Sequence, residues 1–163
     1  MRDPRDDLED LRPDAPPGLY LSRRGNWFHD GERVHHERLS RLLTGAIARL
    51  DTGALVVTTG RDTLPFVAED APIFVRSVDI DVDGAGVTLV LSDGSSEALG
   101  DVVVGPDDRL RAVVRSRAFW ALFTRSAGQL LEPFVQDDAL VVGARRWPVP
   151  ACRADWSAAP PDP

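Results

Sequence analysis

The feature that most constrains the fold is a pair of short apolar runs separated by a glycine-rich turn in the second half of the chain. Ile73 to Val82 and Val87 to Leu91 are the two runs, and Asp83-Gly84-Ala85-Gly86 lies between them. Short runs bounded by Gly, Asp and Ser are typical of strands, and a tight connection makes the strands antiparallel. The sequence therefore predicts a long antiparallel hairpin, with another turn at Ser92-Asp93-Gly94-Ser95.

Helical spacing of apolar residues accompanies the predicted strands at two places. The first predicted helix covers His36 to Leu50, and the second covers about Arg117 to Ala127, capped by Ser116. The other predicted strands are a meander in 19–34, Ala54 to Thr58, Leu64 to Ala68, Val102 to Val104, Leu110 to Val114, Leu131 to Val135 and Ala139 to Val142. The order of strands, helix and two strands occurs twice, which predicts the α+β class and a duplicated strand-helix-strand unit with antiparallel sheets, each packed with one helix.

Proline and glycine are distributed unevenly along the chain. Eight of the 13 prolines lie in residues 1–17 and 150–163, and all 13 glycines lie between these ends. Proline-rich ends with little apolar content are typical of disordered tails. We therefore expect tails at 1–17 and 150–163, an N-terminal α+β domain at 18–72 and a C-terminal α+β domain at 73–149.

Charge and composition exclude several classes of protein. All 19 basic residues are arginine, so Schiff-base enzymes, Walker-type phosphate loops and protein kinases, which need a lysine, are excluded. The formal net charge is −7, and no basic stripe indicates nucleic-acid binding. No apolar run approaches the roughly 20 residues of a membrane span, and the acidic start is unlike a signal peptide, so we expect a cytoplasmic protein. Because Cys152 is the single cysteine, an internal disulfide is excluded.

Two motif-like strings fail as metal sites. Asp79 to Gly84 begins like a calcium-binding EF-hand loop, but its twelfth position is Val90 in place of a glutamate. His35-His36-Glu37 begins like a zinc-protease helix, but the second histidine of that motif would stand at Ser40. The Gly-x-Ser-x-Gly elbow of hydrolases and the dinucleotide fingerprint are also missing. The sequence therefore predicts a non-enzymatic protein with no catalytic residues, metal or cofactor.

A group of arginines near the predicted second helix offers a binding chemistry. Arg109, Arg111 and Arg115 fall on one face of a predicted strand, and Arg117 opens the helix. Guanidinium groups beside the N–H groups of a helix start bind anions. Alternatively, they form ordinary ion pairs with acids such as Asp107, Asp108, Glu69 or Asp70. The sequence leaves both interpretations open.

Several strings resemble the uncharacterised bacterial family called domain of unknown function 1285. The strings, which occur in order between about residues 18 and 149, are Gly25-Asn-Trp27-Phe28-x-x-Gly31, His36-x-x-Leu39-x-x-Leu42, Val67-Ala-Glu69-Asp70-Ala71-Pro72 and Ser116-Arg117-Ala118-x-Trp120-x-Leu122. The resemblance implies two domains built by duplication, the second similar to pleckstrin-homology-like folds. It also implies a small, nucleotide-like ligand at the domain interface, a role in signal transduction, and no known catalytic activity.

The resemblance carries over to individual positions of this chain. The matching residues are Trp27, Glu69, Asp70, Pro72 and Arg117. Members often have a Glu-Lys pair shortly before the Glu-Asp-Ala-Pro segment, whereas this chain has Asp62-Thr63, so a lysine that contacts an anion in relatives is lost or replaced by Arg61.

The leading hypothesis is a cytoplasmic, non-enzymatic sensor or adaptor that binds a small anionic, nucleotide-like ligand between its domains. The ligand-binding residues would be Trp27, Glu69, Asp70, Arg115 and Arg117. The alternative is a protein–protein interaction module in which these residues only lock the domain junction; a protein partner or a homo-oligomer stays open. Acid/base catalysis by Glu69 and Asp70 is disfavoured, because adjacent residues of a strand face opposite sides.

Overall fold

A computed structural model describes residues 12–163 of the chain. The chain divides into two compact units, residues 1–70 and residues 71–163. The sequence had placed this boundary after Pro72, so the Glu69-Asp70-Ala71-Pro72 segment contains the division. In the part of the chain that the structure covers, no helix is both long enough and apolar enough to span a membrane.

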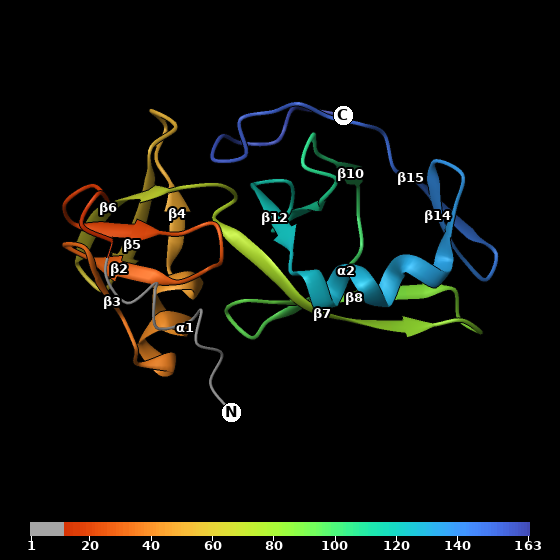
Figure 1. The fold of residues 1–163 in the computed structure, drawn as a ribbon, viewed down its shortest axis with the longest axis horizontal. Coiled ribbons are helices and arrows are strands. Elements are labelled where there is room, and N and C mark those ends of the chain that lie inside the picture. The colour runs from red at the N-terminus through yellow and green to blue at the C-terminus, as the bar shows by residue number, and fades with distance from the viewer. Residues whose placement is uncertain (1–11) are drawn as a thin grey trace. The chain divides into compact units, whose positions relative to one another are not determined.

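The first unit is built around one six-stranded sheet with the strand order β3-β2-β1-β6-β5-β4. Its elements are β1 (Leu19–Leu21), β2 (Trp27–His29), β3 (Glu32–Arg33), α1 (Glu37–Gly45), β4 (Ile47–Arg49), β5 (Leu55–Thr59) and β6 (Asp62–Ala68) (Figure 1). β1 and β6 are parallel, and the other neighbours are antiparallel. The parallel pair therefore joins two antiparallel meanders into one sheet.

The second unit contains another six-stranded sheet, with the order β10-β11-β12-β7-β8-β9, and a three-stranded sheet. The strands of the larger sheet are β7 (Ile73–Asp81), β8 (Gly86–Leu91), β9 (Ser96–Ala98), β10 (Val102–Val104), β11 (Leu110–Val114) and β12 (Phe119–Phe123). After it come α2 (Arg125–Leu131), the 3-10 turn η2 (Glu132–Phe134), β13 (Val135–Gln136), β14 (Ala139–Val142) and β15 (Arg145–Pro148). α2 lies along β7 (Figure 1).

The two larger sheets have the same topology. In each of these sheets, the strand that comes first in the chain pairs in parallel with the strand that comes last in the same sheet, β1 with β6 and β7 with β12. The residue after the last strand donates its N–H to the carbonyl of the third residue of the first strand, over 2.9 Å from Glu69 to Leu21 and 3.0 Å from Thr124 to Val75. This agreement fits two similar α+β domains. The expectation of antiparallel sheets holds for the other neighbours of the two larger sheets and is wrong for one parallel pair in each.

The predicted long hairpin is confirmed as β7 and β8, which pair from Val75↔Leu91 to Asp81↔Gly86. Along β8, Val87, Leu89 and Leu91 are buried and alternate with half-buried residues. The turn is closed by the Asp81 carboxylate, whose Oδ1 accepts the N–H of Gly84 over 2.9 Å. Asp81 therefore stabilises the turn that the glycines predict.

The first predicted helix is shorter than expected. α1 begins after His36, whose Nδ1 accepts the N–H of Leu39 over 3.3 Å, and it ends at Gly45. Ile47 then enters strand β4, where its side chain is 6% exposed and its backbone pairs with β5. The apolar spacing of the helix continued by chance into this strand, and the β-branched Ile47 favours the extended form.

The second predicted helix is wrong over most of its length. Phe119–Phe123 forms β12, and all five of its residues are buried. A strand buried on both faces reads as a continuous apolar run, which helical periodicity does not separate from a buried helix. α2 starts only after Thr124, whose Oγ1 accepts the N–H of Ala127 over 3.3 Å. The predicted strand Leu131 to Val135 is likewise wrong except at its last residue, because Leu131 ends α2, Glu132–Phe134 form η2 and only Val135 enters strand β13.

The two predicted tails differ from expectation where the structure describes them. Residues 1–11 of the first tail lie outside the described residues, whereas the N–H of Arg12 donates to Gly31 O over 2.8 Å. The second tail is packed: Ala151 forms a parallel bridge with Val104, and the Trp156 ring packs against Trp120. The expectation of disorder at 150–163 is therefore wrong, because a tryptophan anchors a proline-rich segment that cannot pair as a regular strand.

Candidate functional site

Trp27, a predicted ligand-binding residue, belongs to the core of the first unit. Its side chain is 1% exposed and its ring centroid lies 4.9 Å from that of Phe66. The indole Nε1 donates to Thr44 Oγ1 over 3.0 Å, so its polar atom has a partner inside the unit. In this structure Trp27 shapes the sheet and offers no surface to a ligand.

Glu69 and Asp70 lie beside arginines of their own unit. The Glu69 carboxylate accepts the backbone N–H of Arg23 over 2.8 Å and Nη2 of Arg12 over 3.2 Å. Asp70 is 5% exposed, and its Oδ2 lies 3.8 Å from Nε of Arg23. Both acids therefore have cationic partners within residues 12–70.

The surroundings of Glu69 hold it in the charged form. Burial raises the pKa of Glu69, but the N–H of Arg23, the Tyr20 hydroxyl and the charge of Arg12 outweigh burial and place its pKa below the ordinary value. Burial and the nearby Glu69 carboxylate raise the pKa of Tyr20. A carboxylate that is fixed in this way is a poor general base, which agrees with the argument against acid/base catalysis.

In the second unit, the connection from β11 to β12 carries the two arginines of the predicted site. Arg115, Ser116 and Arg117 have φ values of 51°, 53° and 68°, so three consecutive side chains occupy the left-handed region. The prediction that Ser116 caps a helix is wrong, because this turn joins two strands of a hairpin. Non-glycine residues in this region are strained and are found preferentially at functional sites.

The strained turn directs its two arginines to different partners. Arg115 Nη2 lies 2.7 Å from Asp93 Oδ2, and its backbone N–H donates to Glu97 Oε1 over 3.0 Å. Arg117 forms an ion pair with Asp101 and donates to the carbonyl of Pro161 over 3.0 Å. Burial raises the pKa of Asp93, but its bonds to Ser95 and Arg115 outweigh burial and lower it.

The remaining arginines of the group are also engaged. Nη1 and Nη2 of Arg111 form a two-pronged contact with the Asp107 carboxylate, over 2.8 and 2.9 Å, and Arg109 donates to Phe123 O over 2.7 Å. The bonds from Arg111 lower the pKa of Asp107 to about 2. The ion-pair interpretation therefore holds for Arg111, Arg115 and Arg117, but only Asp107 was among the predicted partners.

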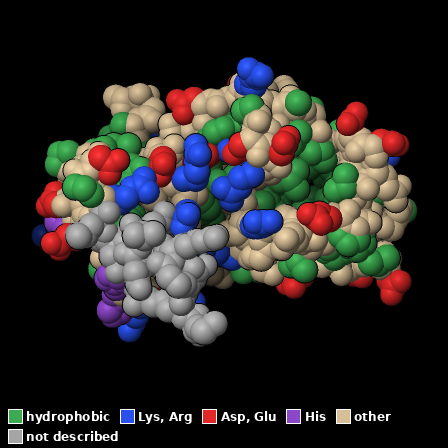
Figure 2. All heavy atoms as spheres, viewed as in Figure 1, with side chains coloured by type: hydrophobic (Ala, Val, Ile, Leu, Met, Phe, Trp, Pro, Cys, Tyr) green, Lys and Arg blue, Asp and Glu red, His purple; other side chains and the backbone are tan. Residues whose placement is uncertain are grey.

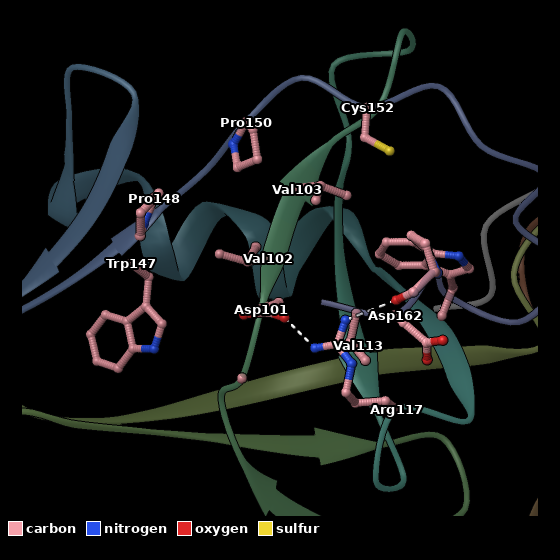
Figure 3. Close-up of a pocket in the computed structure, with 13 residues that line it drawn as sticks. Asp101, Val102, Val103, Val113, Arg117, Trp147, Pro148, Pro150, Cys152 and Asp162 are labelled. Atoms are coloured by element: carbon pink, nitrogen blue, oxygen red, sulfur yellow. Dashed lines mark hydrogen bonds and ion pairs between the residues drawn. The ribbon is translucent and has the colours of Figure 1, made fainter.

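Arg117 borders a pocket of about 290 Å³ that is formed wholly by the second unit. Its lining comes from β10, β11, the β11–β12 turn, β12, β15 and the C-terminal segment, and consists of Gly100, Asp101, Val102, Val103, Val113, Arg117, Trp120, Trp147, Pro148, Pro150, Cys152, Pro161 and Asp162. In the space-filling view, hydrophobic side chains line a hollow on the visible face of this unit (Figure 2). Figure 3 shows Arg117 turned toward Asp101, with Pro148, Pro150 and Cys152 on the segment that passes β10.

Two donors that belong to residues of the pocket lining lack acceptors. Nε of Arg117 and Nε1 of Trp120 are buried and have no hydrogen-bond partner among residues 12–163. Trp120 as a whole is 2% exposed. A buried N–H without a partner costs roughly 1–3 kcal/mol. A ligand whose oxygens accepted hydrogen bonds from these two donors would recover this free energy on binding.

The structure brings together only part of the predicted site. Of its five residues, Arg117 borders the pocket and Arg115 does not, while Trp27, Glu69 and Asp70 belong to the first unit. Sequence reasoning missed Asp101 and Pro161, and it did not name Trp120 among the ligand-binding residues. A signal for the C-terminal wall was present, because Trp156 is an unusual residue for a disordered tail.

The described residues hold no cluster of three or more His, Cys, Asp or Glu side chains that could share a metal ion.

No family model and no curated protein matches the chain. Among solved structures, a DUF1285 family protein from Silicibacter pomeroyi DSS-3 is similar, with a TM-score of 0.68 and 18% identity, over 88% of this chain and 85% of that one. A second, a DUF1285 family protein from Shewanella baltica OS155, has a TM-score of 0.50 and 17% identity, over 67% of this chain and 85% of that one. The resemblance indicated by the sequence strings is thus confirmed as a shared fold.

Proposed function

We propose that the protein is a cytoplasmic, non-enzymatic sensor or adaptor that binds a small organic anion in the pocket beside Arg117. The observation that carries the proposal is the pair of buried N–H donors, Nε of Arg117 and Nε1 of Trp120, which both lack an acceptor. The proposed site lies within the second unit, whereas the sequence had placed it at the domain interface. The role in bacterial signal transduction and the pleckstrin-homology-like assignment of this unit rest on the family resemblance alone.

The chemistry of the lining defines the class of ligand. Val102, Val113 and Trp147 give the pocket apolar walls, which suit an aromatic or aliphatic body. The volume of about 290 Å³ is near the lower end of small-molecule sites, which span roughly 300–1,000 Å³. Planar guanidinium groups favour carboxylate and phosphate oxygens. We therefore propose a compact ligand with a carboxylate or a phosphate, a class that includes small nucleotide-like molecules.

The ion pair between Arg117 and Asp101 limits the affinity of this pocket for an anion. Asp101 holds Nη1 of Arg117 and Pro161 O holds Nη2, so the anion would gain from Nε and from the Trp120 indole. The Asp101 carboxylate also repels an incoming anion. Replacement of Asp101 by asparagine removes this repulsion and leaves the size of the pocket almost unchanged, so the pocket attracts an anion more strongly. The variant Asp101→Asn is therefore expected to bind anions more tightly than the natural protein.

A thermal-shift experiment tests the proposal with benzoate, indole-3-carboxylate, adenosine monophosphate and guanosine monophosphate as probes. A bound probe raises Tm with concentration, because it binds only the folded state. We expect at least one probe to raise Tm, Asp101→Asn to enlarge the shift and Arg117→Ala to abolish it. Benzamide, the uncharged analogue of benzoate, is expected to give a smaller shift than benzoate.

Arg115→Ala is the matched control, because Arg115 is on the same turn and also loses one ion pair, but it does not line the pocket. This variant should respond to the probes as the natural protein does, and circular dichroism should show that both alanine variants are folded. The proposal fails if no probe shifts Tm, or if Arg117→Ala and Arg115→Ala respond equally.

A protein–protein interaction module is the second candidate, and an exposed helix face favours it. Leu39 and Leu42 lie one helical turn apart on α1 and are 44% and 61% exposed. Such a face is suited to a partner or to a second copy of the chain. If it joins two copies, sedimentation velocity will show a concentration-dependent dimer that Leu42→Ser disrupts. A monomer at every concentration contradicts the self-association form of this proposal.

A further inference from the structure

The C-terminal segment of residues 153–163 is packed on the second unit without joining a sheet. The last backbone pairing before it is that of Ala151 and Cys152 with Val104. No residue of 153–163 is in a strand or a helix. Pro160, Pro161 and Pro163 have no N–H to donate, and proline favours an extended path. Around Trp156 the chain makes a tight turn, in which the N–H of Ala158 donates to Asp155 O over 3.1 Å and the N–H of Ser157 donates to Asp155 Oδ1 over 3.0 Å. The segment therefore lies on the domain as a peptide with one turn lies on its receptor.

Trp156 is the central anchor of this segment. Its ring is 4.1 Å from the guanidinium carbon of Arg111, and its centroid is 5.2 Å from that of Trp120, at an interplanar angle of 86°. A cation over an indole face and an edge-to-face aromatic pair are two favoured contacts of tryptophan. Arg111 and Trp120 thus form a clamp around one aromatic side chain.

Both residues of the clamp are fixed in position by the rest of the second unit. Arg111 is 1% exposed, and the two-pronged contact with Asp107 fixes the plane of its guanidinium group. Trp120 is 2% exposed within β12. A site whose side chains are already positioned loses little freedom when it binds, which is the usual property of a recognition site. Further along the segment, the Pro161 carbonyl accepts from Arg117 and provides a second point of attachment.

We propose that the clamp of Arg111 and Trp120, together with Arg117, is a docking site for a proline-containing peptide that turns at a tryptophan. In this chain the site is filled by residues 153–163. The partner is a segment of the same chemistry: one tryptophan in a turn for the clamp, followed within a few residues by a proline whose carbonyl accepts from a guanidinium group, as that of Pro161 does. The inference concerns the segment and its clamp, so it holds whether or not the neighbouring pocket binds a small anion.

The covalent attachment of residues 153–163 to the domain controls the access of other peptides to the site. A segment attached to its own receptor has a high effective concentration, so it excludes a free peptide of equal affinity. Weakening the tethered copy at its central anchor removes this competition without altering the clamp. The variant Trp156→Ala in the full chain therefore opens the site, and a peptide with the natural sequence of residues 153–163 can then occupy it.

The experiment measures fluorescence anisotropy of a labelled synthetic peptide of residues 153–163, titrated with the full chain. We expect saturable binding to the Trp156→Ala chain, at least tenfold weaker binding to the natural chain, and no binding to either chain when the peptide itself carries alanine for tryptophan. Equal binding of the natural peptide to both chains overturns the proposal, because the peptide then binds elsewhere. The absence of binding to a folded Trp156→Ala chain also overturns it.

Hydrogen exchange of the natural chain provides a second test that needs no variant. If the segment leaves its clamp while the domain stays folded, the amides of residues 153–159 exchange at least tenfold faster than those of β12. Exchange of both sets at one common rate shows that the segment opens only when the unit unfolds, and it overturns the proposal. Neither test uses a small-molecule probe, so failure here is distinguishable from failure of the anion-binding proposal.

Discussion

Replacing Asp107 by asparagine tests how the clamp is supported. Asp107 holds Arg111 by two bonds of 2.8 and 2.9 Å, and the Arg111 side chain is 1% exposed. Asparagine keeps the shape of the side chain and one acceptor oxygen but removes the negative charge. A buried guanidinium group would then lack its counter-charge, which is the costly way to break a buried pair.

The size of the effect follows from the pKa. A pKa lowered from 3.8 to about 2 corresponds to at most about 2.5 kcal/mol of stability at neutral pH. The Asp107 side chain is 34% exposed, so solvent screening reduces this contribution to about 1–1.5 kcal/mol. Leaving Arg111 without a counter-charge adds a further cost of about 1 kcal/mol, since asparagine still accepts one hydrogen bond. We expect Asp107→Asn to lower the free energy of unfolding by about 2–2.5 kcal/mol.

The dependence on pH gives the sharper test. Because the pKa of Asp107 is lowered in the folded state, its contribution is complete above about pH 4 and is lost as the pH falls through about 2. Urea unfolding followed by tryptophan fluorescence measures this, because Trp120, Trp147 and Trp156 belong to the second unit. The difference between the natural chain and Asp107→Asn should be largest at pH 5–7 and shrink toward pH 2.

Asp108→Asn is the matched control. Asp108 has a φ of 57°, a conformation that asparagine also tolerates, and it is exposed. This variant should change the free energy of unfolding by less than about 0.5 kcal/mol. A loss below about 0.5 kcal/mol for Asp107→Asn, or a loss that is the same at pH 3 and pH 7, would refute the reasoning.

Three further substitutions test the backbone around this unit, each by urea unfolding. A Cβ at Gly105 would overlap Nη1 of Arg111, so Gly105→Ala should lower the free energy of unfolding by about 2 kcal/mol. In a double-mutant cycle with Asp107→Asn, the double variant should lose less than the sum of the two single losses. Ser116→Gly should stabilise by about 0.5–1 kcal/mol, because it relieves a φ of 53° at an exposed position; a destabilised variant would contradict the argument. Gly143 has a φ of 56° and a Cβ there would lie 2.6 Å from Val82 O, so Gly143→Ala should cost about 2–4 kcal/mol; a cost under 1 kcal/mol would be contrary evidence.

Features of the fold that depend on local sequence were predictable. The β7–β8 hairpin follows from glycines in its turn and from alternating apolar residues, and the division of the chain lies within the Glu69-Asp70-Ala71-Pro72 segment. β12 was not predictable from spacing, because a strand buried on both faces has no period of two. The parallel pairing of β1 with β6 depends on contacts between residues far apart in the chain, which local patterns do not encode.

The candidate site was predictable to a smaller extent. Arg117 was named from its residue type and from the family strings, and it does border a pocket. Its partner Asp101 follows the β9 strand and meets Arg117 only because β10, β11 and β12 are neighbours in one sheet. The C-terminal wall was missed because its prolines suggested disorder, whereas the contact of Trp156 with Trp120 cannot be read from composition.

The parallel pair at the centre of each larger sheet also determines when that sheet can be completed. Leu19 pairs with Phe66 and Ile73 with Ala121, so the first strand of each unit waits for a neighbour made almost 50 residues later. On the ribosome, β1 and β7 therefore emerge well before the strands that protect one of their edges. Each larger sheet can be completed only when the last of its strands is released, so synthesis must proceed past β6 to complete the first sheet and past β12 to complete the second.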